Sequence, residues 1–172
     1  MAPITAADGF KMAALNSFDP FVYPFYGLVA GVGQLRDSPE AWGQDWKGYG
    51  QRYLASFADG AISSSFTTGL MPALLKQDPR YFQGRADGFL PRFGYAASRV
   101  AVTRSRSGTP QFNLSEVSGT LATATVSNLY YPQDERTASA TLTRWGMQVM
   151  WDIVANELKE FWPDIRKLRH GS

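Results

Sequence analysis

Residues 46–76 read WKGYGQRYLASFADGAISSSFTTGLMPALLK, and this stretch decides the fold. Its helical spacing is interrupted by a single proline, so it predicts one long helix with a kink near Pro72. Gly60, Ser64 and Thr68 follow one another at intervals of four. Small residues at this spacing let the backbone of a second helix approach closely. The stretch therefore predicts a tightly packed helical protein.

A second stretch of small residues follows further along the chain. The run Asn113-Leu114-Ser115-Glu116 is typical of a capping box, in which Asn113 and Glu116 satisfy the first backbone groups of a helix. This helix is expected to continue to about Tyr130 and to end before Pro132. Its small residues also recur every four positions, and we expect both stripes at helix–helix contacts. The members of this stripe are Ser115, Gly119, Thr123 and Ser127.

The other expected elements are also helical. Thr5 to Asp8 resembles a capping box with aspartate in the glutamate position. Serine or aspartate before proline is a favourable start for a helix. No strand pairing is expected anywhere. The further helices are expected from residue 5 to 16, from Ser38-Pro39-Glu40 onward, from Asp78-Pro79 onward, from 91 to 103 and from 137 to 161, with a turn or short helix after Pro163, a polar hairpin at 105–110 and a proline-broken aromatic segment at 20–33.

These elements together predict an all-α protein. Its architecture is a compact bundle of about five or six helices packed through small residues. A chain of 172 residues is long enough for one continuous core, so residues 1–170 are expected to form a single helical domain. Gly171-Ser172 is expected to be a remnant of an expression tag.

Composition excludes several classes of protein. The 44% hydrophobic and 19% charged residues are typical of a globular chain, and the net charge of +2 gives no reason to expect nucleic acid as a partner. Cysteine is absent and the only histidine is His170, so we expect no metal site, no cofactor and no histidine-based catalysis. No uncharged stretch reaches the 20 or so apolar residues that a membrane-spanning helix needs.

Four runs of residues resemble a known family. They are Asp78-Pro79-Arg80-Tyr81-Phe82, Phe112-Asn113-Leu114-Ser115-Glu116, 127–132 (SNLYYP) and 159–165 (KEFWPDI). Over residues 5–169 the chain resembles a family of uncharacterised, mostly exported proteins of acidobacteria. The resemblance implies a precursor with an export signal and a location in the periplasm or cell envelope. It implies no activity and no catalytic residue.

Arginines are concentrated in the middle of the chain. The chain contains 12 Arg against 5 Lys, and six of the arginines fall within 27 residues. Such a stretch suits either a solvent-exposed face with ion pairs to Asp59, Glu116 or Asp152, or a site for anionic lipid or glycan. Arg92, Arg99 and Arg106 would share one face if the helix continues that far. The arginines of the stretch are Arg80, Arg85, Arg92, Arg99, Arg104 and Arg106, of which we take Arg80, Arg92, Arg99 and Arg104 as candidate ligand-binding residues.

A polar stripe follows the last long helix. If it faces outward, it is an ordinary solvent face. If it faces Glu116, Asn128 and Tyr131 of the preceding helix, it forms a buried polar network that can line a ligand pocket. Asn128, Tyr131, Gln148 and Asp152 are therefore further candidate ligand-binding residues. The stripe consists of Thr141, Trp145, Gln148, Asp152 and Asn156.

Three carboxyl groups are candidates for catalysis. Asp59, Glu116 and Asp152 are the acids most embedded among apolar or small residues. Two of them about 5–9.5 Å apart could hydrolyse a glycosidic bond, although Glu116 already has a role in the capping box. We therefore expect a non-enzymatic envelope protein that binds or scaffolds lipid, glycan or protein. An Asp/Glu-dependent hydrolase or lyase acting on envelope polymers, and a self-assembling structural subunit, are the alternatives.

Overall fold

Helices form most of the structure, a computed structural model that describes residues 4–84 and 87–170. Arg85 and the pair Gly171-Ser172 lie outside the described residues. The π-helical turn η2 (Ser65–Leu70) joins α3 to α4, so these three elements form one continuous helical rod. The described residues therefore contain six helical rods, and the prediction of a mostly helical bundle is confirmed. The α-helices are α1 (Ala6–Ser17), α2 (Val22–Leu35), α3 (Trp46–Ser64), α4 (Met71–Leu75), α5 (Phe89–Ser98), α6 (Leu114–Ser127) and α7 (Ala138–His170).

A small antiparallel sheet was not predicted. It contains β1 (Gln77–Asp78), β2 (Val102–Ser105) and β3 (Pro110–Phe112) in the order β1-β2-β3. Asp78 pairs with Arg104, and Arg104 pairs with Pro110. The helix expected to reach residue 103 instead ends at Ser98, while the polar hairpin expected at 105–110 is confirmed as the connection between β2 and β3. Two 3-10 turns complete the fold, η1 (Glu40–Trp42) and η3 (Gln133–Glu135).

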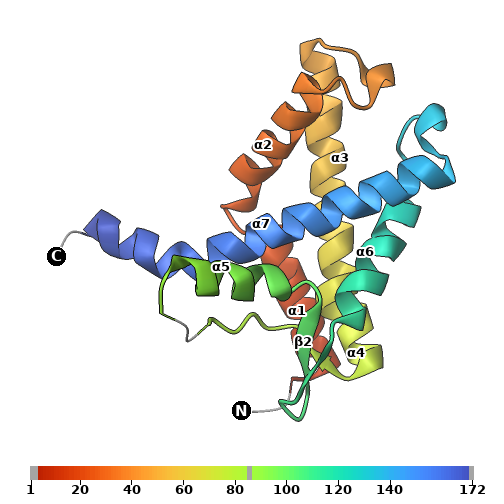
Figure 1. Cartoon of the computed structure of the whole chain (residues 1–172). Helices are drawn as coiled ribbons and strands as arrows, with labels where there is room; N and C mark the ends of the chain where they lie inside the picture. Colours follow the sequence, from red (N-terminus) through yellow and green to blue (C-terminus); the bar gives the residue numbers. More distant parts are fainter. Residues whose placement is uncertain (1–3, 85–86, 171–172) are drawn as a thin grey trace.

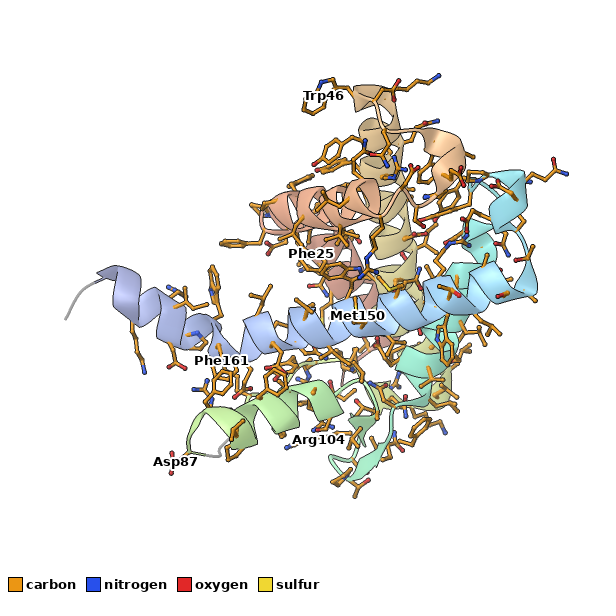
Figure 2. The ribbon with its side chains drawn as sticks, turned by 45° about the horizontal axis from the view of Figure 1, so that its top comes forward. Phe25, Trp46, Asp87, Arg104, Met150 and Phe161 are labelled. Atoms are coloured by element: carbon orange, nitrogen blue, oxygen red, sulfur yellow. The ribbon has the colours of Figure 1, made fainter. Side chains whose placement is uncertain are left out.

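The helix α7 organises the arrangement (Figure 1). It runs across the molecule, with α5 along one side and α6 packed beneath its N-terminal half. The pair α2 and α3 projects to one side of α7, and the small sheet lies at the opposite end of the molecule beside α4. Phe161 of α7 lies between α7 and α5 (Figure 2), where its ring stacks 5.2 Å from that of Phe89.

The small-residue stripes lie at helix–helix contacts, as predicted. A Cβ atom on Gly119 would lie 2.8 Å from Thr67 Cγ2 and 3.1 Å from the Thr67 backbone nitrogen, so α6 and η2 pack too closely for a side chain at this position. The Ser64 hydroxyl donates to the Ala13 carbonyl of α1 at 3.2 Å. Gly60 lies directly beneath the hydroxyl group of Tyr26 from α2.

Close packing of the helices leaves little room for large apolar side chains at their centre. The largest fully buried side chains are Glu160, Thr120, Thr123 and Ser127. Threonine and serine hydroxyls on α6 donate to carbonyl groups four residues earlier, as Thr123 does to Gly119 at 2.9 Å. Among the described residues, the buried apolar side chains are Ile4, Ala13, Ala30, Ala55, Ala96 and Ala124.

Capping residues behave largely as the sequence indicates. Thr5 and Asp8 form the reciprocal capping box of α1, with the Thr5 backbone nitrogen 3.0 Å from the Asp8 carboxylate. Asn113 caps α6 by accepting from the Glu116 backbone nitrogen at 3.2 Å. The reciprocal half of that box is absent, because the Glu116 carboxyl group is hydrogen-bonded to Asp152 instead.

Two prolines do not interrupt helices where we expected them to. Pro24 lies in the first turn of α2, where a backbone N–H has no partner within the helix, so the aromatic segment forms a regular helix. Pro163 lies inside α7 and leaves the Lys159 carbonyl without its usual donor. The Gln83 side chain donates to that carbonyl at 3.4 Å, which compensates for the missing bond.

Asp78-Pro79 does not start a helix, contrary to the prediction. The Asp78 carboxylate accepts from the Arg80 backbone nitrogen at 3.0 Å and so closes a local turn. Gln77 donates to the Phe112 carbonyl at 2.7 Å and accepts from the Ser115 backbone nitrogen at 2.8 Å. These long-range bonds hold the segment beside the sheet, an effect that local sequence does not encode.

Candidate functional site

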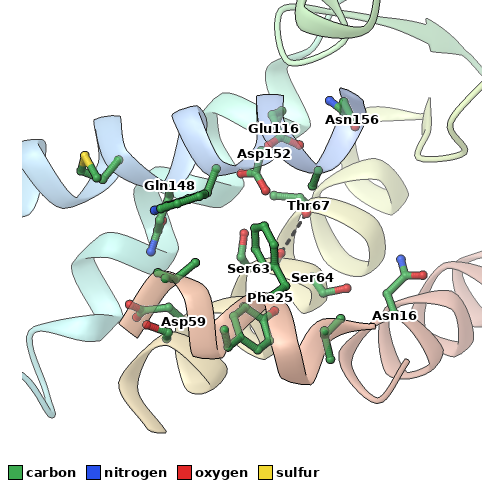
Figure 3. A pocket seen from close by; sticks show the side chains of 18 of the residues that line it. Asn16, Phe25, Asp59, Ser63, Ser64, Thr67, Glu116, Gln148, Asp152 and Asn156 are labelled. Carbon is green, nitrogen blue, oxygen red and sulfur yellow. Dashed lines mark hydrogen bonds between the residues drawn. The ribbon is translucent and has the colours of Figure 1, made fainter. Parts of the chain in front are cut away.

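A cavity of about 1310 Å³ lies between α2, α3 and α7. One face of α7 lines it from Ser139 to Trp162, a helix length of about 35 Å at 1.5 Å per residue. The facing walls come from α2 and α3 (Figure 3). The cavity is larger than the 300–1,000 Å³ typical of small-molecule sites, and its length suits an elongated molecule.

Aromatic side chains join α2 to α7 across the cavity. Phe25 meets Trp151 edge-to-face at a centroid distance of 5.6 Å, and Phe21 meets Trp162 at 4.6 Å. Phe25 reaches from α2 into the space in front of α7 (Figure 3). Such rings provide a largely apolar lining with defined geometry. The aromatic segment therefore covers one side of the cavity.

Two of the three candidate carboxyl groups meet on the cavity wall. Glu116 of α6 and Asp152 of α7 are joined by a side-chain hydrogen bond and lie next to each other in Figure 3. Burial raises the pKa of Glu116 well above its usual range, and the negative charge of Asp152 raises it further. Burial also raises the pKa of Asp152, although the bond from Glu116 opposes that effect. The two groups share a proton, with Glu116 as the donor.

Gln148 lies one turn before Asp152 on the same face of α7 and also lines the cavity. Both polar atoms of its amide group are buried, and neither has a hydrogen-bond partner among the residues that the structure describes. A buried amide left without partners is costly, by about 1–3 kcal/mol for each unsatisfied group. Gln148 is therefore the least satisfied polar group of the cavity.

Asp59, the third candidate carboxyl group, is held by hydroxyl groups. It accepts hydrogen bonds from Ser127 and Tyr130, and from the Tyr131 hydroxyl at 2.9 Å. Burial raises the pKa of Asp59, and these three hydroxyl donors oppose that rise. Its two oxygens are thus occupied within the protein, which assigns Asp59 to the structure that supports the cavity.

Tyr26 also lines the cavity, close enough to Asp152 and Asp59 for their charges to act on its hydroxyl group. Burial raises the pKa of its hydroxyl to about 12, and the negative charges of Asp152 and Asp59 contribute to the rise. Tyr26 is therefore a neutral hydroxyl group at physiological pH, in a cavity wall that also contains Asp59 and Gly60.

The polar stripe of α7 faces inward, which was one of the two alternatives. Thr141 bonds to Asn128 of the loop after α6, with 3.0 Å between Asn128 Nδ2 and the Thr141 hydroxyl. The Trp145 indole N–H donates to the Thr120 hydroxyl at 3.0 Å. The other three members of the stripe, Gln148, Asp152 and Asn156, line the cavity.

Asn128 and Tyr131 have structural partners. Asn128 Oδ1 accepts from the Arg144 guanidinium group at 3.0 Å, and the same guanidinium group lies 3.7 Å from the centroid of the Tyr131 ring. Tyr131 also lines the cavity, whereas Asn128 is not part of its lining.

The candidate arginines are mostly engaged by the protein itself. Arg92 pairs with Glu160 at 3.1 Å and with Asp164 at 2.5 Å, and it does not line the cavity. Arg80 pairs with Asp78 at 2.5 Å. These acids differ from the ion-pair partners that we expected, Asp59, Glu116 and Asp152.

The remaining arginines lie near the sheet. Arg99 lies over the ring of Tyr95 and donates to the Val102 carbonyl. Arg104 lies 4.7 Å from the centroid of the Phe82 ring. Since α5 ends at Ser98, the expected shared face of Arg92, Arg99 and Arg106 does not exist. Arg80, Arg99 and Arg104 do line one end of the cavity.

Several cavity residues were missed by the sequence analysis. Phe21 and Phe25 belong to the aromatic segment that was expected to be broken by prolines, and nothing in their spacing shows that α7 lies opposite. Trp151 and Trp162 were not singled out because they fall outside the polar stripe. Glu160, which does not line the cavity, was also missed, although it is fully buried and accepts from Tyr81, Gly84 and Arg92.

Comparisons of the chain with profiles of protein families, with curated proteins and with solved structures found no match. The site must therefore be interpreted from its own geometry. Within residues 4–84 and 87–170, no group of three or more acidic or histidine side chains is placed to hold a metal ion. None of the helices in that part of the chain is long and apolar enough to cross a lipid bilayer.

The carboxyl pair makes stability depend on pH. Because the pKa of Glu116 is raised on folding, the folded protein keeps a proton that the unfolded chain releases above about pH 4.5. That stabilisation is lost as the pH rises toward the raised pKa. We expect Glu116→Gln, which keeps a hydrogen-bond donor to Asp152, to become more stable than the parent protein as the pH rises from 5 to 8, by at least about 1.4 kcal/mol.

Urea unfolding at several pH values measures this difference. Asp134→Asn, at an exposed position in η3, is the control and should follow the parent protein at every pH. A constant difference between Glu116→Gln and the parent across the range would show that the two carboxyl groups do not share a proton.

Proposed function

We propose that this chain is a binding protein that holds an elongated, largely apolar molecule such as a lipid in the cavity along α7. The observation that supports this most strongly is the cavity itself, about 1310 Å³ in volume and lined by α7 from Ser139 to Trp162. A protein whose only role is structural has no reason to keep such a space, since packed interiors are normally filled. The resemblance to exported proteins supports a location in the cell envelope.

A fluorescent apolar probe tests the proposal. N-phenyl-1-naphthylamine should bind with a saturable rise in fluorescence, and decanol should displace it. Ser63 of α3 and Ala155 of α7 line two walls of the cavity. We expect Ser63→Phe/Ala155→Phe to weaken probe binding at least tenfold by filling the space.

The matched control places the same two phenylalanines outside the cavity. Ser65 and Val154 are exposed neighbours on the same two rods, so Ser65→Phe/Val154→Phe should bind the probe as the parent does. Circular dichroism of each variant checks its fold. Equal loss of binding in both double variants, or binding that does not saturate, would contradict a cavity site.

The geometry does not favour glycoside hydrolysis. That reaction needs two carboxyl groups about 5–9.5 Å apart, with room for a sugar or a water molecule between them. Glu116 and Asp152 are instead hydrogen-bonded directly to each other. Asp59 is occupied by three hydroxyl groups. A binding role therefore fits this arrangement better than the hydrolase that we considered as an alternative.

Self-association is a second candidate function, favoured by the apolar surface. Many large apolar side chains are exposed, among them Leu35 (89%), Trp46 (88%), Leu129 (79%) and Leu90 (76%). Exposed apolar surface on this scale marks interaction sites in soluble proteins. Light scattering over a hundredfold range of protein concentration tests it, and a constant monomer mass would contradict it.

A further inference from the structure

A cluster of polar side chains lies partway along the α7 face of the cavity. Gln148, Asp152 and Asn156 occupy successive turns of α7, and Glu116 joins Asp152 from α6. Apolar side chains of the same helix line the cavity beside these polar groups, namely Met147, Trp151, Leu158 and Trp162, whereas Ser139, Thr143 and Arg144 line its end near the start of α7. A ligand lying along α7 therefore meets the polar patch next to apolar side chains.

The polar patch is rich in acidic groups. Two carboxyl groups that share one proton keep one negative charge between them. The neighbouring Tyr26 contributes a neutral hydroxyl group, and the third carboxyl group, Asp59, lies on the same cavity wall as Tyr26. A negative charge in apolar surroundings is costly unless a positive group or several donors balance it.

The nearby cations of the protein balance that charge only in part. Lys159 lines the cavity, and its positive charge lowers the pKa of both Glu116 and Asp152, but its side chain is exposed to solvent, which screens that effect. The Arg52 guanidinium group is bound by carbonyl groups of Pro39, Ser38 and Gly43. The Arg144 guanidinium group is bound by Asn128 and the Glu135 carbonyl.

The unpartnered amide of Gln148 is a second, independent indication of a ligand at this place. Its buried oxygen accepts no hydrogen bond among the described residues, and its position one turn from Asp152 brings an acceptor to the same patch. An oxygen acceptor beside a carboxylate suits a group with several N–H donors, and a protonated amine has three.

We infer that the ligand of this cavity carries a basic nitrogen, which binds to the Glu116–Asp152 pair and Gln148 while an apolar body lies along α7. This inference rests on the proposed function, because it names the chemical class of the molecule that the cavity holds. It also differs from the anionic lipid or glycan expected from the arginine-rich stretch. Carboxylate and phosphate groups would meet like charge at this patch.

The test compares three molecules with the same ten-carbon chain. Decylamine, decanol and decanoate, each below its micelle concentration at pH 7, compete with N-phenyl-1-naphthylamine for the protein. We expect decylamine to bind at least tenfold more tightly than decanol, and decanoate to bind most weakly. This order is measured on the unaltered protein and so does not depend on whether any variant folds.

A variant then assigns the preference to the carboxyl pair. In Glu116→Gln/Asp152→Asn the advantage of decylamine over decanol should disappear while decanol binding remains, and Asp134→Asn should keep the full preference. Equal binding of decylamine and decanol, or tighter binding of decanoate, would overturn the basic-nitrogen inference and leave the cavity function standing. If none of the three displaces the probe, the proposed function fails as well.

Discussion

Gly119→Leu is expected to destabilise the protein by about 3 kcal/mol, because the new side chain has no space between α6 and η2. Even a Cβ atom there would lie 2.8 Å from Thr67 Cγ2 and 3.2 Å from Thr67 Cα. The nearest atoms include backbone, which cannot rotate away as the end of a long side chain can. For a chain of this size the melting temperature should fall by about 6–12 °C.

The matched control is Gly146→Leu on α7. Gly146 is exposed, and no atom lies within 4 Å of the position that a Cβ atom would take. Leucine has a higher helix propensity than glycine, so this variant should be unchanged or more stable by up to about 1 kcal/mol. If Gly119→Leu melts within a degree or two of the parent protein, the close contact between α6 and η2 is wrong.

Local signals in the sequence were sufficient to predict several elements. The Thr5–Asp8 capping box and the Asn113 cap depend on residues three positions apart, which the sequence displays directly. The contacts at Gly60 and Gly119 followed from small residues every four positions, because only such residues permit close helix packing. The interpretation of residues 46–76 as one helical rod was also correct, although its irregular turn begins at Ser65 rather than at Pro72.

The errors occurred where long-range contacts overrode local preference. Gln77 forms hydrogen bonds to Phe112 and Ser115, and these hold Gln77 and Asp78 in a strand where the sequence favoured a helix start. The helix α7 continues past Pro163, and Gln83, distant in sequence, donates to the Lys159 carbonyl that the proline leaves without its usual donor. Such bonds exist only after the chain has folded, so propensity and spacing cannot reveal them.

The candidate site was predicted in part. Glu116, Asp152 and Gln148 were singled out, but spacing along α7 could not show whether their stripe faced α6 or solvent. The capping role assigned to Glu116 also concealed its second partner, because Asn113 caps the helix through the Glu116 backbone and leaves the carboxyl group available. The cavity itself depends on the position of α2, which reaches α7 through pairs such as Phe25 and Trp151.

Glu160→Gln is also expected to lower the stability of the folded protein strongly. The Glu160 side chain is fully buried, and its carboxylate accepts from the Tyr81 hydroxyl at 2.9 Å, the Gly84 backbone nitrogen at 3.0 Å and Arg92 Nε at 3.1 Å. Burial alone would raise the pKa of Glu160, but these donors hold it below its usual range. An amide would turn its NH2 group toward at least one donor. It would also remove the negative charge that balances the positive charge of Arg92.

Breaking one partner of a buried ion pair typically costs 3–5 kcal/mol, so urea unfolding at pH 7 should show a loss on the order of 3 kcal/mol. Asp164→Asn is the matched control, because Asp164 binds the same Arg92 but is 44% exposed, and it should cost less than about 1 kcal/mol.

The stabilisation by Glu160 is present above about pH 4.5 and is lost as the pH falls through its lowered pKa. The difference between Glu160→Gln and the parent should therefore shrink on acidification, opposite in sign to the dependence expected for Glu116→Gln. Equal losses for Glu160→Gln and Asp164→Asn would show that burial of Glu160 is not what makes it important.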